Sequence, residues 1–356
     1  MKLPLTLYVL SFTLLSAKVV FGTSAPAVSE DSERISEAID SKETNETRDS
    51  EDEEQLGDMV VSFQSEFQKM EIYEYADIYG STIRQLYIEG ALQSSTQDEF
   101  IYHESLVHPV MLAHPEPKRV AVLGGGEGAT LKTVLTHSTV EVATMVELDK
   151  AIVDFSKEYL TEMCGSAFDD PRAELKFQDA FAFVKNMDAE PVKYDVVIMD
   201  IVDPEDIVYV NNSAAAHLYS NKFFKFIAKR TLNPDGVFVM QAGEMSLTDV
   251  YHKEKFAVLE SMLKYFFKVV IRYMVYVPSF GAEWSFLLCC HRPEDCERIT
   301  NFETSYKHVF NELKNRNIPP ESMRFYDHES HQRIMSMPPG VRGVGRNVGK
   351  DFAFVL

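Results

Sequence analysis

The sequence predicts an α/β protein built on a Rossmann-like parallel sheet, with a small β-rich module in front of it. Two observations predict this fold. From residue 119 onward, short runs typical of buried strands alternate with segments of helical period. The first run, 119–123, leads directly into the turn Gly124-Gly125-Gly126-Glu127-Gly128 and a helix-like segment to His137.

Three later strands of the predicted sheet stop at an acidic residue. A strand at 141–146 stops at Glu147, one at 174–178 stops at Asp179, and the buried run 194–199 stops at Asp200. One more strand is expected at 237–241, and apolar runs at 269–277 and 284–290 add mixed elements. Because parallel strands end at the same edge of a sheet, these carboxylates are expected to face one crevice.

The chain before this sheet divides into three parts. Residues 59–117 contain alternating or clustered apolar runs and a Glu89-Gly90 turn, which predict the β module, and residues 118–356 form the Rossmann-like catalytic domain. Residues 23–58 are rich in Ser, Glu and Asp and lack aromatics, which predicts a disordered acidic tail. Residues 1–22 have the basic start, apolar run and small residues of a signal peptide.

The signal peptide predicts entry into the secretory pathway, with the endoplasmic reticulum lumen or the extracellular space as destination. Cleavage is expected after Gly22 or Ala27, and a plastid route that begins with the same signal is the alternative. The apolar run at 5–17 is too short to cross a membrane, so no stable span is expected after cleavage. The sequons at Asn45 and Asn211 become candidate glycosylation sites on this route.

The charge argues against nucleic-acid binding, and the cysteines argue against a dense disulfide framework or a metal site. The net charge is −20, without a basic stripe, so a nucleic-acid binder is not expected. Cys164, Cys289, Cys290 and Cys296 show neither a dense disulfide framework nor paired metal spacing, and no metal site is expected. The adjacent Cys289 and Cys290 are expected to be buried strand residues.

The glycine turn and the next strand end predict a nucleoside site. Gly124 and Gly126 allow the backbone to approach a ligand, and Glu147, about 20 residues beyond the turn, can accept hydrogen bonds from both hydroxyls of a ribose. A structural role for Glu147, capping the following helix, is the alternative. Glu127 puts a carboxylate inside the turn, which argues against a pyrophosphate and favours a cationic donor such as S-adenosylmethionine or its decarboxylated relative.

Three further carboxylates suit the rest of such a reaction. Asp179 is positioned to meet an adenine amino group, unless it is simply a surface loop residue. Asp200 can take the proton from an ammonium substrate, and Asp203 can hold the remaining cationic amine. A turn beginning at Asp203-Pro204 explains Asp203 alone but explains the pair less well.

The sequence resembles the spermidine and thermospermine synthases, a family of polyamine aminopropyltransferases with a class I methyltransferase-type sheet. The resemblance runs from about Met59 to about Arg342, in the order and spacing of successive motifs. These are Asp98-Glu99-Phe100-Ile101-Tyr102-His103-Glu104, the 124–128 turn, Val146-Glu147-Leu148-Asp149, Phe168-Asp169-Asp170-Pro171-Arg172, residues 194–204, Gln241, Phe325-Tyr326-Asp327 and Met337-Pro338.

The resemblance implies roles for the individual residues. Asp200 is the implied catalytic base, and Tyr102, His103 and Asp203 are implied to line the amine site. The implied donor is decarboxylated S-adenosylmethionine, a co-substrate and not a permanently bound cofactor. The implied donor-site residues are Gln68, Gly124, Gly126, Glu127, Glu147, Asp179 and Ala180. The family also implies a homo-oligomer and a polyamine or diamine acceptor.

The motifs favour a thermospermine-type enzyme, with spermidine synthesis from putrescine as the alternative. Residues 103–109 and Val277-Pro278-Ser279-Phe280 resemble thermospermine synthases, and spermidine synthases usually have tyrosine in place of Phe280. Residues 168–172 instead resemble bacterial enzymes of broader amine preference. After Pro204 the chain departs from the family: a longer loop precedes Leu218-Tyr219, and Ala180 replaces the usual glycine.

Two other functions remain open from the residues alone. An S-adenosylmethionine methyltransferase would share the fold, although Glu127 should repel the methionine carboxylate of its donor. A non-catalytic polyamine-binding protein is the second alternative.

Overall fold

The computed structural model describes residues 57–187, 193–204, 216–318 and 322–342. All of them belong to one compact unit, residues 55–356. The expected signal peptide and nearly all of the acidic tail lie outside the described residues, as do both sequons and most of the longer loop after Pro204.

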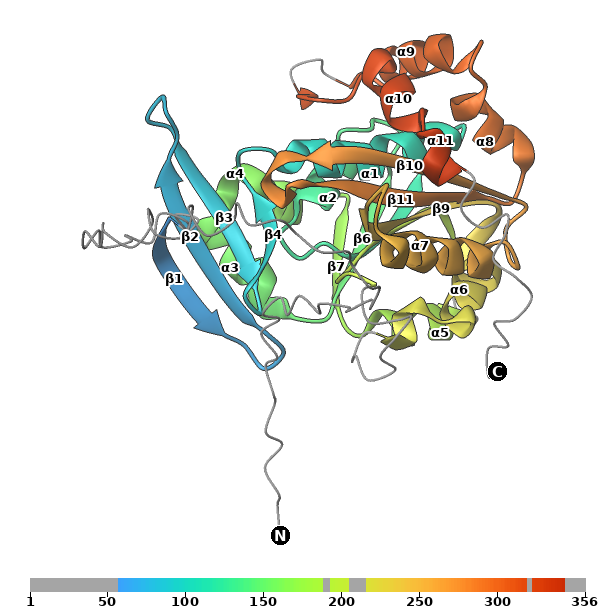
Figure 1. Ribbon diagram of the computed structural model, residues 1–356. Coiled ribbons are helices and arrows are strands. Elements are labelled where there is room, and N and C mark those ends of the chain that lie inside the picture. The colour runs from blue at the N-terminus through green and yellow to red at the C-terminus, as the bar shows by residue number, and fades with distance from the viewer. Residues whose placement is uncertain (1–56, 188–192, 205–215, 319–321, 343–356) are drawn as a thin grey trace, which may run out of the picture. The chain divides into compact units, whose positions relative to one another are not determined.

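The small module is a four-stranded antiparallel sheet, drawn in blue in Figure 1. Its strands follow chain order: β1 Asp58–Gln64, β2 Lys69–Ala76, β3 Thr82–Ile88 and β4 Ala91–Ser95. Glu89 and Gly90 both have positive φ and form the tight turn between β3 and β4, which the sequence predicts at these two residues.

The next element, helix α1 (Glu99–Ala113), still falls within the range 59–117 that the sequence assigns to the β module. It is buried along nearly its whole length, and its apolar side chains, among them Leu106 and Val110, belong to the core of the large sheet. The antiparallel module therefore ends at about Ser95, because α1 packs with the second domain.

The large sheet has seven strands in the order β10-β11-β9-β8-β5-β6-β7, which confirms the predicted Rossmann-like α/β class. Five strands are parallel, whereas β11 runs antiparallel to β9 and β10 antiparallel to β11. The bounds are β5 Arg119–Gly124, β6 Val142–Glu147, β7 Ala173–Phe177, β8 Tyr194–Asp200, β9 Leu232–Met245, β10 Val269–Val277 and β11 Ala282–Cys290.

Helices cover both faces of this sheet, so its central strands are apolar on both sides. Val120 and Val122 of β5 face one core, and Ala121 and Leu123 face the other. The helices are α2 Ala129–Leu135, α3 Lys150–Tyr159, α4 Thr161–Cys164, α5 Ala180–Asn186, α6 Asn221–Phe226, α7 Val250–Leu263, α8 Pro293–Thr300, α9 Ser305–Asn315, α10 His328–Met335 and α11 Pro339–Arg342.

A third, smaller core joins the antiparallel module to the large domain. Met70 and Ile72 of β2 pack with Ile152 and Phe155 of α3 in this core. A hydrogen bond of 2.6 Å from the Ser65 hydroxyl to an Asp149 carboxylate oxygen adds a polar link. The turn between β1 and β2 is therefore held close to the end of β6.

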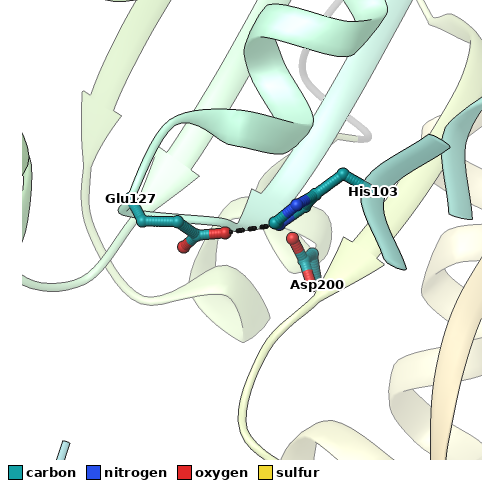
Figure 2. A group of neighbouring side chains, drawn as sticks. All are labelled: His103, Glu127 and Asp200. Carbon is teal, nitrogen blue, oxygen red and sulfur yellow. Dashed lines mark hydrogen bonds and ion pairs between the residues drawn. The ribbon is translucent and has the colours of Figure 1, made fainter. Parts of the chain in front are cut away.

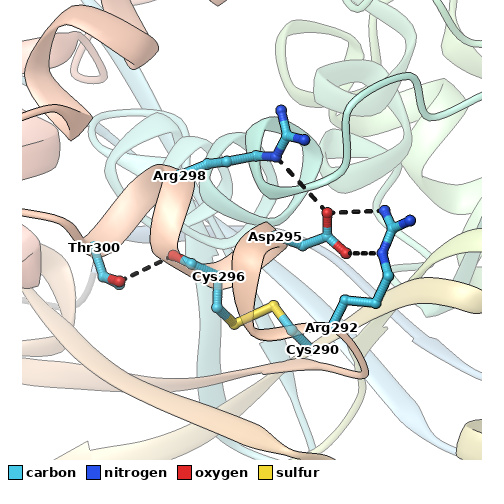
Figure 3. Close-up of a disulfide and its surroundings, with 6 residues drawn as sticks. All are labelled: Cys290, Arg292, Asp295, Cys296, Arg298 and Thr300. Carbon is cyan, nitrogen blue, oxygen red and sulfur yellow. Dashed lines mark hydrogen bonds and ion pairs between the residues drawn. A yellow bond between two sulfur atoms is a disulfide. The ribbon is translucent and has the colours of Figure 1, made fainter.

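A disulfide between Cys290 and Cys296 joins the end of β11 to α8, a pairing that the cysteine spacing does not reveal (Figure 3). Cys289 and Cys290 are both buried in β11, as expected. Asp295, fully buried beside the disulfide, receives two hydrogen bonds from the Arg292 guanidinium. No helix in the described part of the chain is both long and apolar enough to cross a membrane.

Candidate active site

The carboxyl ends of β5 and β8 meet at the glycine turn. Gly124 lies beside Asp200 in the parallel register, and the Gly125 N–H donates to the Asp200 carbonyl at 2.8 Å. Gly124 has φ +84°, and a Cβ there would lie 2.0 Å from the Asp200 carbonyl oxygen. Only glycine permits this approach, which brings the turn against the end of β8.

Both carboxylate oxygens of Asp200 accept hydrogen bonds. The Tyr102 hydroxyl of α1 donates to Oδ1 at 2.7 Å, and the Thr130 hydroxyl of α2 donates to Oδ2 at 2.5 Å. Burial and the negative charge of Glu127 raise the pKa of Asp200, while His103, Thr130 and Tyr102 oppose the rise. Asp200 therefore has the chemistry of a base whose proton affinity is set by its neighbours.

His103 lies between two carboxylates. Its Nδ1 is 2.9 Å from Glu99 Oε2, and its Nε2 is 2.9 Å from Glu127 Oε1, as Figure 2 shows for Glu127. Although burial opposes the charged ring, the hydrogen bonds to Glu127 and Glu99 raise the pKa of His103 to about 10. The ring is therefore an imidazolium that donates from both nitrogens.

His103, Glu127 and Asp200 are also the one group in the described chain whose side-chain ligand atoms lie close enough for a metal ion, within 4.8 Å of one another. A histidine that binds a metal must present a neutral lone pair. Because both nitrogens of His103 face carboxylates, the hydrogen bonds fit an ion-pair network better than a metal centre.

Glu147 lies against the glycine turn, as the spacing predicts. A Cβ on Gly126 would lie 3.1 Å from Glu147 Oε2 and 2.3 Å from a methyl group of Ile152, so a side chain at position 126 would close the gap between turn and carboxylate. Burial raises the pKa of Glu147 to about 7. The hydrogen bond from the Asp149 N–H lowers this pKa, and the negative charge of Glu127 raises it further.

Asp179 and Ala180 stand at the end of β7, where α5 begins. Asp179 is the N-cap of α5, accepting a hydrogen bond of 2.7 Å from the Ala182 N–H on Oδ1. Its other oxygen accepts from His217 Nε2 at 3.3 Å. Asp179 thus combines a helix cap with an oxygen turned toward the segment that follows the long loop.

Asp203 lies beyond the end of β8 and is oriented by Gln241. The Gln241 amide, buried in β9, donates to Asp203 Oδ1 at 3.0 Å and to the Ile201 carbonyl at 2.8 Å. Nearby, the Tyr219 hydroxyl donates to the Val202 carbonyl at 2.5 Å. These bonds fix the chain that carries the second carboxylate of the predicted pair.

Gln68 is the predicted site residue supplied by the small sheet. It is half-buried in the β1–β2 turn, and its N–H donates at 3.0 Å to the Ser65 hydroxyl, which donates to Asp149 two residues beyond Glu147. The turn therefore holds Gln68 at the β6 side of the site.

Phe280 packs near both Tyr102 and Trp284. The Phe280 ring centroid lies 6.2 Å from that of Tyr102 and 4.7 Å from that of Trp284. The Ser279 N–H donates to Asp98 Oδ2 at 2.6 Å, which ties this segment to the start of α1. The aromatic side chains form an apolar wall next to the carboxylates.

Three residues of this network are given no site role by the sequence, although the first and the last stand in motifs of the family resemblance: Glu99, Thr130 and Gln241. Glu99 is four residues before His103 on one helix, so the i,i+4 spacing of an acid and a histidine is a signal that could have identified the pair. Thr130 gave no comparable signal, because its partner is 70 positions away in the sequence.

The family model described as "Spermine/spermidine synthase domain" matches residues 99–299 of this chain. The "Polyamine aminopropyltransferase" of Pyrobaculum aerophilum is 39% identical over 280 residues, covering 78% of this chain and 88% of the relative. "Polyamine aminopropyltransferase 2" of Pseudomonas aeruginosa is 43% identical over 213 residues, 60% of this chain and 57% of the relative.

Solved structures agree with these sequence matches. A spermidine synthase in complex with the transition-state analogue AdoDATO superposes with a TM-score of 0.67 at 25% identity, covering 81% of this chain and 88% of that one. The spermidine synthase of Thermotoga maritima gives a TM-score of 0.65 at 25% identity, covering 81% and 87%.

Proposed function

This chain is an aminopropyltransferase of the spermine/spermidine synthase family, and we propose that it transfers the aminopropyl group of decarboxylated S-adenosylmethionine to a polyamine. The observation that carries the proposal is Asp200, held on both carboxylate oxygens at the end of β8 and within reach of Glu127 and His103.

The donor is proposed to lie along the carboxyl ends of β5, β6 and β7. Glu127 keeps one carboxylate oxygen clear of His103, so it can accept a hydrogen bond from the aminopropyl ammonium. Glu147 accepts from the ribose hydroxyls, and Asp179 with Ala180 meets the adenine. Gln68 closes the nucleoside end from the small sheet. The sulfonium and ammonium charges of the donor suit this row of carboxylates.

The acceptor amine is proposed to enter between Asp203, Tyr102 and Phe280. Asp200 takes a proton from the attacking ammonium, which frees the nitrogen lone pair. The nitrogen then forms a bond to the aminopropyl carbon while the carbon–sulfur bond breaks. The bonding electrons leave with sulfur, so neutral methylthioadenosine is released. Positioning of the two substrates supplies the rest of the acceleration.

For the acceptor we propose a triamine such as spermidine, giving a thermospermine-type product. Phe280 and Trp284 support this choice, because an apolar wall beside Tyr102 suits a long methylene segment and offers no hydroxyl to a nearby ammonium. Putrescine is the second candidate, since solved spermidine synthases share the fold.

One experiment tests the reaction and the acceptor together. The purified protein is incubated with decarboxylated S-adenosylmethionine and equal amounts of putrescine, spermidine and spermine, and products are identified by mass spectrometry. We expect methylthioadenosine and a tetraamine. Methyl transfer from S-adenosylmethionine without methylthioadenosine release would contradict the proposal.

Asp200→Asn separates an enzyme from a polyamine-binding protein. An amide keeps the shape but cannot take the proton, so turnover should fall by at least about a hundredfold while donor binding persists. Equal turnover in Asp200→Asn and the wild type would rule out Asp200 as the base.

We further propose that the protein enters the secretory pathway. The signal-like segment at 1–22 motivates this, and the Cys290–Cys296 disulfide supports it, because disulfides are rare in reducing compartments. A fluorescent fusion of the full chain should colocalise with a marker of the endoplasmic reticulum, whereas deletion of 1–22 should leave it cytosolic. Identical distributions would contradict the proposal.

A further inference from the structure

The Thr130 hydroxyl contacts Asp200 from a buried position at the start of α2. Thr130 is the second residue of α2 and is completely buried, and its hydroxyl lies 2.5 Å from Asp200 Oδ2. The other donor to this carboxylate, the Tyr102 hydroxyl, approaches Oδ1 from α1. Two helices from different parts of the chain thus hold the two oxygens separately.

This is not where a helical threonine usually directs its hydroxyl. In a helix the hydroxyl commonly bonds to the carbonyl three or four residues earlier. Thr133, one turn later in α2, does so by donating to the Ala129 carbonyl at 2.9 Å. Thr130 lies too near the start of α2 for this pattern, because the residue four positions before it belongs to the glycine turn.

We propose that Thr130 is the positioning residue that orients Asp200 for proton transfer. With one donor on each oxygen, the carboxylate cannot rotate about its Cβ–Cγ bond without losing a hydrogen bond. The remaining lone pairs then point in fixed directions. Because Thr130 is buried, no substrate competes for its hydroxyl, whereas Tyr102 lines the proposed acceptor site.

The same hydrogen bond sets the proton affinity of Asp200. The titratable groups that act on Asp200 come from two elements: Tyr102 and His103 of α1 and Glu127 of the glycine turn. Asp200 and Asp203 both raise the pKa of Tyr102 and of Tyr219, which lies in the 3₁₀ turn Ala216–Tyr219. Burial and Glu127 raise the pKa of Asp200, and the Thr130 hydrogen bond is among the contacts that lower it.

The test compares three variants of α2. Thr130→Val keeps the shape and removes the hydroxyl, Thr130→Ser keeps the hydroxyl, and Thr133→Val makes the same exchange at a neighbouring threonine that does not contact Asp200. A hydrogen bond to a charged group corresponds to about one pKa unit. In the dependence of kcat on pH, Thr130→Val should therefore move the acidic limb to higher pH by about one unit. It should also lower kcat at the optimal pH without raising the donor KM.

In Thr130→Ser the acidic limb of the kcat–pH profile should lie where it does in the wild type, and Thr133→Val should not shift it. This inference rests on the proposed role of Asp200, so a second readout is independent of turnover. The Asp200 carboxyl carbon is titrated by NMR in protein labelled with ¹³C-aspartate, with the signal assigned by Asp200→Asn. Its midpoint should rise by the same amount in Thr130→Val alone.

The outcomes separate the two proposals. A wild type that turns over no amine would contradict the proposed function, while the NMR midpoint would still decide the role of Thr130. Thr130→Val with an unchanged midpoint, or a shift equal to that of Thr133→Val, would overturn the inference. Thermal unfolding of each variant checks that the compared proteins are folded at the assay temperature.

Discussion

His103 Nε2 donates a hydrogen bond of 2.9 Å to Glu127 Oε1, so the carboxylate in the glycine turn is anchored before any donor arrives. Glu99 holds the opposite nitrogen of the ring at 2.9 Å. This hydrogen bond has a consequence for each of the two residues. His103 supports the donor site, and Glu127 presents one oriented oxygen instead of a freely rotating carboxylate.

Removing the imidazole should weaken the donor site. His103→Ala leaves Glu127 without its anchor, and the donor KM should rise about tenfold, which corresponds to about 1.4 kcal/mol. Glu99→Gln, which removes only the partner behind the ring, should raise the donor KM in the same direction but less. Steady-state kinetics with varied donor measures both. A lower donor KM in His103→Ala would instead mean that the imidazolium repels the donor ammonium.

Donor affinity should depend on pH through Glu147. Because the pKa of Glu147 is about 7, the group is a carboxylate above that pH and gains a proton below it. Only the carboxylate accepts from both ribose hydroxyls, so binding should weaken as pH falls from 8 to 6. Calorimetric titration with methylthioadenosine, which lacks the ammonium, isolates this effect. Glu147→Gln should bind weakly with a flat profile, and an equal slope in the variant would refute the assignment.

Phe280 should influence the choice of acceptor. Phe280→Tyr adds a hydroxyl beside Tyr102, which should favour the closely spaced second ammonium of putrescine over the methylene segment of spermidine. The ratio of kcat/KM for putrescine to that for spermidine should rise about tenfold, or about 1.4 kcal/mol. Competition assays measure it, with Phe302→Tyr, at a phenylalanine that is 77% exposed, as the control. An unchanged ratio would remove Phe280 as a determinant.

The buried His331 should make stability depend on pH. Its Nε2 donates to the Ile299 carbonyl at 2.7 Å, so its Nδ1 accepts from the Tyr326 hydroxyl at 2.6 Å. Burial lowers the pKa of His331 to about 4, below the usual 6.5. The unfolded chain therefore binds the proton more readily, and this contribution to stability is present above pH 6.5 and is lost between pH 6.5 and 4.

The loss at this position should be about 1.4 kcal/mol per pH unit over that window. Other groups also titrate there, and Glu147, with its raised pKa, acts in the opposite direction. The comparison is therefore with His331→Gln, which cannot gain the proton. Urea unfolding at pH 7 and pH 5 should show a smaller decrease for the variant. Parallel decreases would show that His331 does not contribute.

The Cys290–Cys296 disulfide should stabilise the connection between β11 and α8. Closing so short a loop contributes about 2 kcal/mol to the free energy of unfolding in the chain-entropy model. Reductant should lower the unfolding midpoint of the wild type and leave Cys296→Ser, already lower, unchanged. Cys164→Ser, at a buried free cysteine, should remain sensitive to reductant. An unfolding midpoint of the wild type that does not change with reductant would contradict the prediction.

Local patterns in the sequence determine the sheet and its acidic edge. The run from Arg119, the glycines at 124 and 126 and the carboxylates at 147 and 200 follow from strand ends that periodicity locates to within a residue or two. Parallel strands place those ends side by side, so the row of carboxylates is predictable without coordinates. The position of helix α1 is less predictable: the helix is buried nearly all round although it carries several polar residues, and its place in the core with Val120 and Val122 depends on packing.

Only the tertiary structure decides which groups contact those carboxylates. Tyr102 and Thr130 reach Asp200 from 98 and 70 positions away, and the pairing depends on how α1 and α2 are rotated against the sheet. The choice of Cys290 over the adjacent Cys289 for the disulfide has the same origin, since alternate residues of a strand point to opposite faces. The sequence alone thus determines the acidic edge, and packing determines the donors that orient its base.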